Sequence, residues 1–152
     1  MLDHDEFVRW LEASDDEAAL AAQLVDLAAF NAVVLHSEQA AQLMLKGLLR
    51  GVGAAREAWG HALAELADRT VATTGLALTD DLRGRLTTLA RDYMPTRYPD
   101  ALTSGTPRDN YTTNDATRAL DTRTQLRAAV VETWERLVAE QGDDEVVGRS
   151  DG

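Results

Sequence analysis

The prolines of this chain constrain its fold more than any other feature. There are only three, at positions 95, 99 and 107, and all lie in one stretch. Elsewhere Ala and Leu dominate and runs of β-branched residues are missing, which favours helix. The length of 152 residues suits one domain. The sequence therefore predicts an all-α bundle whose helices are interrupted once by a long loop.

Apolar residues recur at helical spacing in five segments. The expected helices cover about residues 3–27, 30–49, 60–73, 79–92 and 113–140, and the loop with the prolines covers residues 93–111. The string Ser14-Asp15-Asp16-Glu17 resembles a helix cap, so we expect a kink or a split there. Residues 142–152 are expected to form a disordered acidic tail, which leaves residues 1–141 as the folded domain.

The second expected helix has the clearest pattern. Its inward stripe is made of Phe30, Val33, Val34, Ala41, Met44, Leu45 and Leu48. Its polar residues, Asn31, Glu38, Gln42 and Lys46, are expected on the opposite, wetter face. Gly51 and Gly53 are expected to end it.

Charge and composition exclude several functions. The net charge of −11 has the wrong sign for a general polyanion binder, although residues 39–56 carry a net +3. The chain has no Cys, which excludes a disulfide framework and a thiolate metal site. His and Glu do not show metal-ligand spacing, so we expect no metal and no cofactor. Without a long apolar run or a basic leader, the expectation is a cytoplasmic protein with no membrane contact.

Three segments together resemble one protein family. They are Ser37-Glu38-Gln39-Ala40-Ala41-Gln42-Leu43-Met44-Leu45-Lys46-Gly47-Leu48-Leu49, then Gly60-His61-Ala62-Leu63-Ala64-Glu65-Leu66, and then Tyr93-Met94-Pro95-Thr96-Arg97-Tyr98-Pro99-Asp100. In order and spacing they resemble the HEPN domain family, the helical partner of minimal nucleotidyltransferases. Gln42 stands where the family usually has Glu, and Gly47 where it usually has Ala.

The resemblance implies a five-helix antiparallel up-and-down bundle that is often a homodimer. It also implies a link to RNA or nucleotides, because many members are ribonuclease toxins paired with a nucleotidyltransferase antitoxin. Other members are non-catalytic interaction modules, and that alternative stays open. The ribonucleases carry Arg-x4–6-His near a late helix. Here the one formal match, Arg56 to His61, precedes the third helix, so the motif is not carried over.

Two cations and one histidine are candidates for the site. Lys46 and Arg50 lie one helical turn apart and can grip phosphate, or they can simply form a solvated face. His61 can carry a proton near neutral pH, as metal-independent RNA cleavage requires, or it can cap the third helix.

The loop supplies the remaining candidates. Arg97 would contact phosphate and Tyr98 would stack on a base or donate a proton, with Asp100 beside them. Alternatively, this stretch is a structural turn in which Arg97 pairs with Asp100 or with a helix end. The predicted site thus has His61, Arg97 and Tyr98 as catalytic residues, and Lys46, Arg50, Arg97, Tyr98 and Asp100 as binding residues. The three Trp residues, at 10, 59 and 134, are expected in the core or at an interface.

Overall fold

The computed structural model describes the backbone of residues 1–150 and the side chains of residues 1–144. Within those residues the secondary structure is helical, without strands. The elements in chain order are α1 (His4–Leu24), α2 (Phe30–Gly51), the 3-10 turn η1 (Ala55–Glu57), α3 (Leu63–Thr74), α4 (Asp80–Arg91), the 3-10 turns η2 (Pro99–Ala101) and η3 (Pro107–Asn110), and α5 (Thr113–Ser150). The expected all-α fold with five helices is confirmed.

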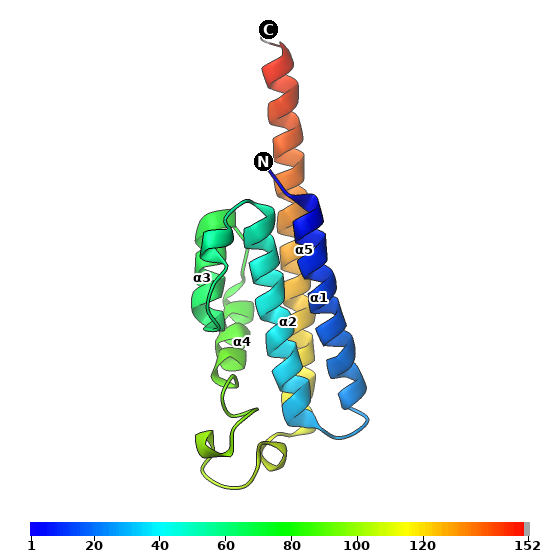
Figure 1. Cartoon of the computed structure of the whole chain (residues 1–152), viewed down its shortest axis with the longest axis vertical. Helices are drawn as coiled ribbons and strands as arrows, with labels where there is room; N and C mark the ends of the chain where they lie inside the picture. The colour runs from blue at the N-terminus through cyan, green and yellow to red at the C-terminus, as the bar shows by residue number, and fades with distance from the viewer. Residues whose placement is uncertain (151–152) are drawn as a thin grey trace.

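Helix α2 is the centre of the bundle. It packs against α1, α3, α4 and α5, and α1 runs antiparallel beside it (Figure 1). Its predicted apolar stripe is inward: Val34, Met44, Leu45 and Leu48 are all at most 1% exposed. Leu82, Leu86 and Leu89 of α4 and Leu126 and Val130 of α5 complete the same core.

The connection after α2 brings the chain back along the bundle. Residues 52–62 leave the top of α2 in Figure 1 and return beside it, so that α3 begins level with the middle of α2. The far end of α3 is fastened to α5, because Arg136 donates to the carbonyl oxygen of Thr74 at 2.9 Å. This route places His61 against α2.

The long loop before α5 is held at both ends. Tyr111 donates its hydroxyl hydrogen to Asp92 at 2.8 Å, joining the start of α5 to the end of α4. Near its beginning Thr96, which is 2% exposed, donates to the carbonyl oxygen of Asp92 at 2.7 Å. The proline-containing stretch is therefore ordered by specific hydrogen bonds.

Several boundaries differ from the sequence prediction. Helix α1 is continuous through Ser14, so the predicted kink or split is wrong: the Ser14 hydroxyl is buried and donates to the carbonyl oxygen of Ala40 on α2 at 2.8 Å. Helix α5 continues to Ser150 and not to about residue 140. The disorder of the acidic tail stays a prediction, and its residues 151 and 152 lie outside the described part of the chain.

A close contact explains the glycine at position 47. A Cβ atom on Gly47 would lie 2.6 Å from the Cβ atom of Trp10, closer than two non-bonded carbon atoms approach each other. Only glycine lets α1 and α2 come this near while Trp10 is present. Among residues 1–150, no helix is both long and apolar enough to span a membrane.

Candidate functional site

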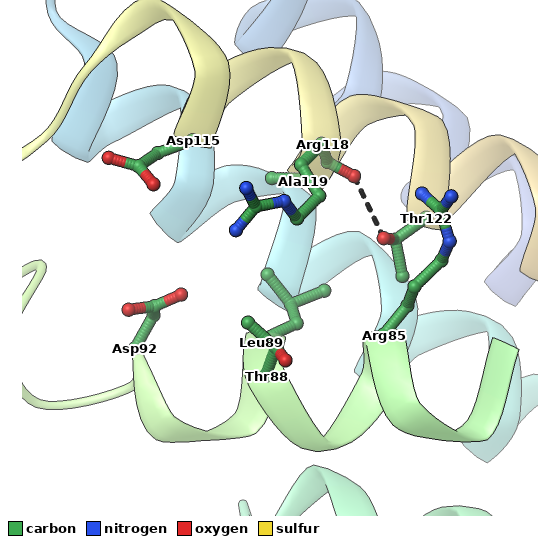
Figure 2. A pocket seen from close by; sticks show the side chains of 8 residues that line it. All are labelled: Arg85, Thr88, Leu89, Asp92, Asp115, Arg118, Ala119 and Thr122. Carbon is green, nitrogen blue, oxygen red and sulfur yellow. Dashed lines mark hydrogen bonds between the residues drawn. The ribbon is translucent and has the colours of Figure 1, made fainter. Parts of the chain in front are cut away.

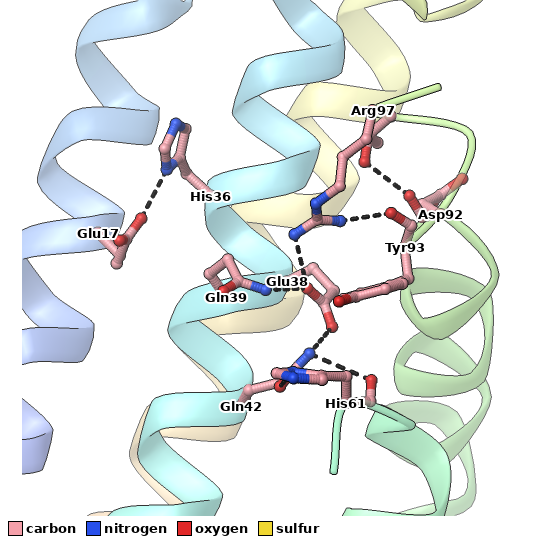
Figure 3. Close-up of polar contacts among 10 residues, drawn as sticks. Glu17, His36, Glu38, Gln39, Gln42, His61, Asp92, Tyr93 and Arg97 are labelled. Carbon is pink, nitrogen blue, oxygen red and sulfur yellow. Dashed lines mark hydrogen bonds and ion pairs between the residues drawn. The ribbon is translucent and has the colours of Figure 1, made fainter. Parts of the chain in front are cut away.

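The middle of the predicted wet face of α2 is buried, which corrects the sequence prediction for Glu38 and Gln42, whereas Asn31 and Lys46 are partly exposed. Glu38 is 1% exposed and Gln42 is 3% exposed. The two residues are one turn apart, so they share a face of the helix. The 93–98 segment and the chain around His61 cover that face (Figure 3).

Glu38 lies at the centre of a group of polar contacts. Its carboxylate accepts a hydrogen bond from Gln39 at 2.8 Å and another from Gln42. The Arg97 guanidinium lies 4.0 Å away. Burial raises the pKa of Glu38 above its usual range, while the two amides and the charge of Arg97 partly oppose that shift. A buried carboxylate with these partners holds several side chains in place.

His61 is joined to the same group through Gln42. Its Nδ1 lies 3.2 Å from the Gln42 side-chain oxygen, and the Gln42 nitrogen donates to the His61 carbonyl oxygen at 3.2 Å. An amide oxygen can only accept, so Nδ1 carries the hydrogen and Nε2 of the neutral ring keeps a free lone pair. The capping interpretation is wrong, because the N-cap of α3 is Ala62 and no side chain caps it.

Tyr93 connects His61 with Arg97. The Arg97 guanidinium stacks 4.2 Å from the centre of the Tyr93 ring, and one of its N–H groups donates to the Tyr93 carbonyl oxygen. The His61 ring stacks on Tyr93 at 5.7 Å between centroids. Figure 3 shows the Tyr93 ring between the other two groups. We call Glu38, Gln42, His61, Tyr93 and Arg97 the Glu38 cluster.

The other predicted site residues lie at different distances from this cluster. Lys46 is one turn beyond Gln42 and half-buried, and burial lowers its pKa while the charge of Glu38 raises it. Arg50 instead contacts α1: it lies 3.8 Å from the Glu6 carboxylate and 4.6 Å from the centre of the Trp10 ring. Tyr98 is 49% exposed on the loop.

Asp100 is exposed in η2, and Arg97 does not pair with it; the guanidinium turns to Glu38 instead. Sequence reasoning thus found His61 and Arg97 but missed Glu38, Gln42 and Tyr93 as members of one cluster. The available signal was the common spacing of Glu38, Gln42 and Lys46 on one helical face.

A second group of polar residues lines a groove between α4 and α5, and no predicted site residue belongs to it (Figure 2). Asp92 and Asp115 stand there with Arg85 and Arg118. Burial raises the pKa of Asp92. Burial also raises the pKa of Tyr111, and the carboxylates of Asp92 and Asp115 raise it further. Among the side chains described, no three His, Asp or Glu residues gather in a way that would hold a metal ion.

Fold and cluster together define an all-α protein that carries polar, ionisable groups on its central helix. The HEPN domain model matches residues 7–134, and the chain therefore belongs to the HEPN domain family.

Two solved structures resemble this one. TT1696 from Thermus thermophilus is 31% identical with a TM-score of 0.75, covering 84% of this chain and 97% of that one. ST0689, an archaeal HEPN homologue, is 24% identical with a TM-score of 0.65, covering 83% of this chain and 95% of the other. A search of curated proteins gives no match.

Proposed function

We propose that this HEPN protein binds RNA or a nucleotide at the Glu38 cluster and cleaves RNA without a metal ion. The observation that supports this most strongly is the Gln42–His61 contact at 3.2 Å, which fixes the ring hydrogen on Nδ1 and leaves Nε2 free to accept a proton. Glu38 in turn orients Gln42. A side-chain base whose orientation is set by a second and a third residue is typical of acid–base catalysis.

The chemistry needs a base, an acid and a cation. His61 Nε2 takes the proton of the ribose 2′-hydroxyl, and the 2′ oxygen attacks the neighbouring phosphorus. Arg97 stabilises the negative charge of the phosphorane. The bond to the 5′ oxygen breaks as that oxygen receives a proton from the half-exposed Tyr98, which leaves a 2′,3′-cyclic phosphate and a 5′-hydroxyl. Lys46 and Asp100 would bind the flanking nucleotide.

As a cellular role, we propose a toxin that acts on cytoplasmic RNA and is neutralised by a minimal nucleotidyltransferase antitoxin. The family implies this pairing, and the net charge of −11 suits a protein partner with a basic surface. Co-expression with a neighbouring nucleotidyltransferase should restore growth that this protein alone suppresses.

A non-catalytic dimerisation or interaction module is the second candidate. The observation in its favour is an open groove between α1 and α2 lined by Arg9, Trp10, Ala13 and Leu43. A second copy of the chain that covers this groove would give a homodimer without any reaction at the Glu38 cluster.

A ribonuclease assay separates the two candidates. The purified protein should cleave single-stranded RNA equally well with and without EDTA, and His61→Ala should lower the rate at least ~100-fold. His4→Ala is the matched control, since His4 is exposed at the start of α1. If RNA stays intact with the wild-type protein, the catalytic proposal is wrong. If folded His61→Ala keeps full activity, His61 is not the base.

A further inference from the structure

Trp59 presents an indole ring to solvent two residues before His61. It is 59% exposed, although a tryptophan normally lies at least partly in a core or an interface. Arg69 of α3 covers one side of the ring, with its guanidinium carbon 4.2 Å from the ring centre. Arg69 also donates to the carbonyl oxygens of Trp59 at 2.6 Å and Glu57 at 3.2 Å. The ring is thus supported on one side and open to solvent elsewhere.

Two cations without a carboxylate partner belong to this region, Arg69 and Lys46. Arg69 has no carboxylate partner among the described side chains, and its neighbour in the sequence, Asp68, is paired with Arg83. Lys46 lies on α2 one turn beyond Gln42, whose side chain contacts His61. Within the same part of the chain the Lys46 ammonium has neither a hydrogen bond nor an ion pair, and the charge of Arg69 acts on it. In a protein with a net charge of −11, an exposed aromatic ring with Arg69 on one side and Lys46 on the neighbouring helix suits an anionic, aromatic ligand.

We propose that Lys46, Trp59 and Arg69 form a second nucleotide subsite, which binds the residue of a single-stranded RNA next to the one at the Glu38 cluster. This inference rests on the proposed function. The base stacks on the open face of Trp59, and Lys46 contacts a phosphate. Because Trp59 and His61 are two residues apart, their backbones lie within about 7 Å, close enough for neighbouring nucleotides of one strand.

The arrangement favours an unpaired strand over a duplex. In a double helix the faces of each base are covered by its neighbours, whereas a single strand can turn a base out onto an aromatic side chain. Lys46 favours a phosphate over a protein partner, since lysine is depleted at the centres of protein interfaces.

The test compares two probes by fluorescence anisotropy and calorimetry. One is a single-stranded 2′-O-methyl oligoadenylate of about eight nucleotides, which cannot be cleaved through the 2′ oxygen, and the other is AMP. Trp59→Leu should weaken oligomer binding roughly 5- to 100-fold, and Trp59→Phe should retain most of it, because stacking needs a ring. Lys46→Gln should also weaken oligomer binding and lower its salt dependence. AMP binding at the Glu38 cluster should be unchanged in the Trp59 variants.

Leu20→Ala is the matched control, because it removes another exposed apolar side chain, 42% exposed, from α1. Arg97→Ala should weaken the binding of both probes, so this variant reports on the Glu38 cluster itself. If Arg97→Ala weakens the binding of both probes while Trp59→Leu binds them like wild type, the proposal of a second subsite is wrong and the proposed function stands. If wild-type protein binds neither probe, both are wrong. Equal affinity for the matching duplex would also overturn the single-strand subsite.

Discussion

Replacing Glu38 should reveal how much the buried cluster contributes to stability. Glu38→Ala removes the acceptor for Gln39 and Gln42 and the carboxylate opposite Arg97. An unsatisfied buried donor costs about 1–3 kcal/mol, and a buried ion pair that loses one member costs about 3–5 kcal/mol. Part of this cost is offset, because the variant no longer has to bury a carboxylate on folding. We expect a net loss of about 2–4 kcal/mol, or a fall in Tm of roughly 5–15 °C.

The loss should also depend on pH. Burial raises the pKa of folded Glu38 above its ordinary value of 4.5, so the folded state holds its proton over a window in which the unfolded state has released it. The free energy of unfolding of the wild type therefore falls as the pH rises through the pKa of Glu38 in the folded state. The variant has no carboxyl group at this position and does not show that fall. The cost of Glu38→Ala should accordingly be smaller at pH 8 than at pH 5.

Urea denaturation followed by circular dichroism at both pH values measures these differences. Glu12→Ala is the control: Glu12 is exposed on α1, and its removal should change stability by less than about 0.5 kcal/mol. A cost for Glu38→Ala below about 0.5 kcal/mol, or one that grows toward pH 8, would show that Glu38 does not hold the cluster in the way described.

Three further predictions concern packing, charge and assembly. Gly47→Ala should destabilise the protein by about 1–3 kcal/mol because of the contact with Trp10, whereas Gly84→Ala, with open space around its Cβ, should stabilise it by up to about 1 kcal/mol in thermal melts. Hydrogen bonds from Arg127 lower the pKa of the part-exposed Asp15, so Asp15→Asn should lower the free energy of unfolding by about 1 kcal/mol or less at pH 7. This loss should shrink as the pH falls below 3.8, and a loss that does not change with pH would contradict the prediction. Light scattering should show a dimer at micromolar concentration, and a mass near 16.6 kDa would exclude it.

Periodicity predicted the helices and their inward faces because burial of apolar side chains is the dominant contribution to this bundle. The Thr79 cap of α4 was also predictable, and its hydroxyl accepts from the Leu82 amide at 3.1 Å. Sequence reasoning failed where the chain folds back on itself. Nothing local shows that residues 52–62 return along α2, so Gln42 looked solvent-exposed and His61 looked like a cap.

The same cause accounts for the error at Ser14. Its neighbours form a string typical of a helix start, but the hydroxyl is satisfied by Ala40 on the adjacent helix. Local periodicity cannot predict that a polar residue is buried by a segment far away in the sequence. Arg97 was identified from the loop pattern, whereas its partner Glu38 depends on a contact between residues far apart in the chain.

The central position of α2 limits how the length of this protein can change. Each residue of an α-helix turns the chain by about 100°, so a single insertion between Glu38 and Gln42 would point one of them away from the covering segments. The same insertion would displace Leu45 and Leu48, both fully buried, from the core. By contrast, residues 103–106 are exposed, and added residues there would lengthen a surface loop without displacing a buried side chain. Insertions and deletions among related chains should therefore collect in that loop and avoid α2.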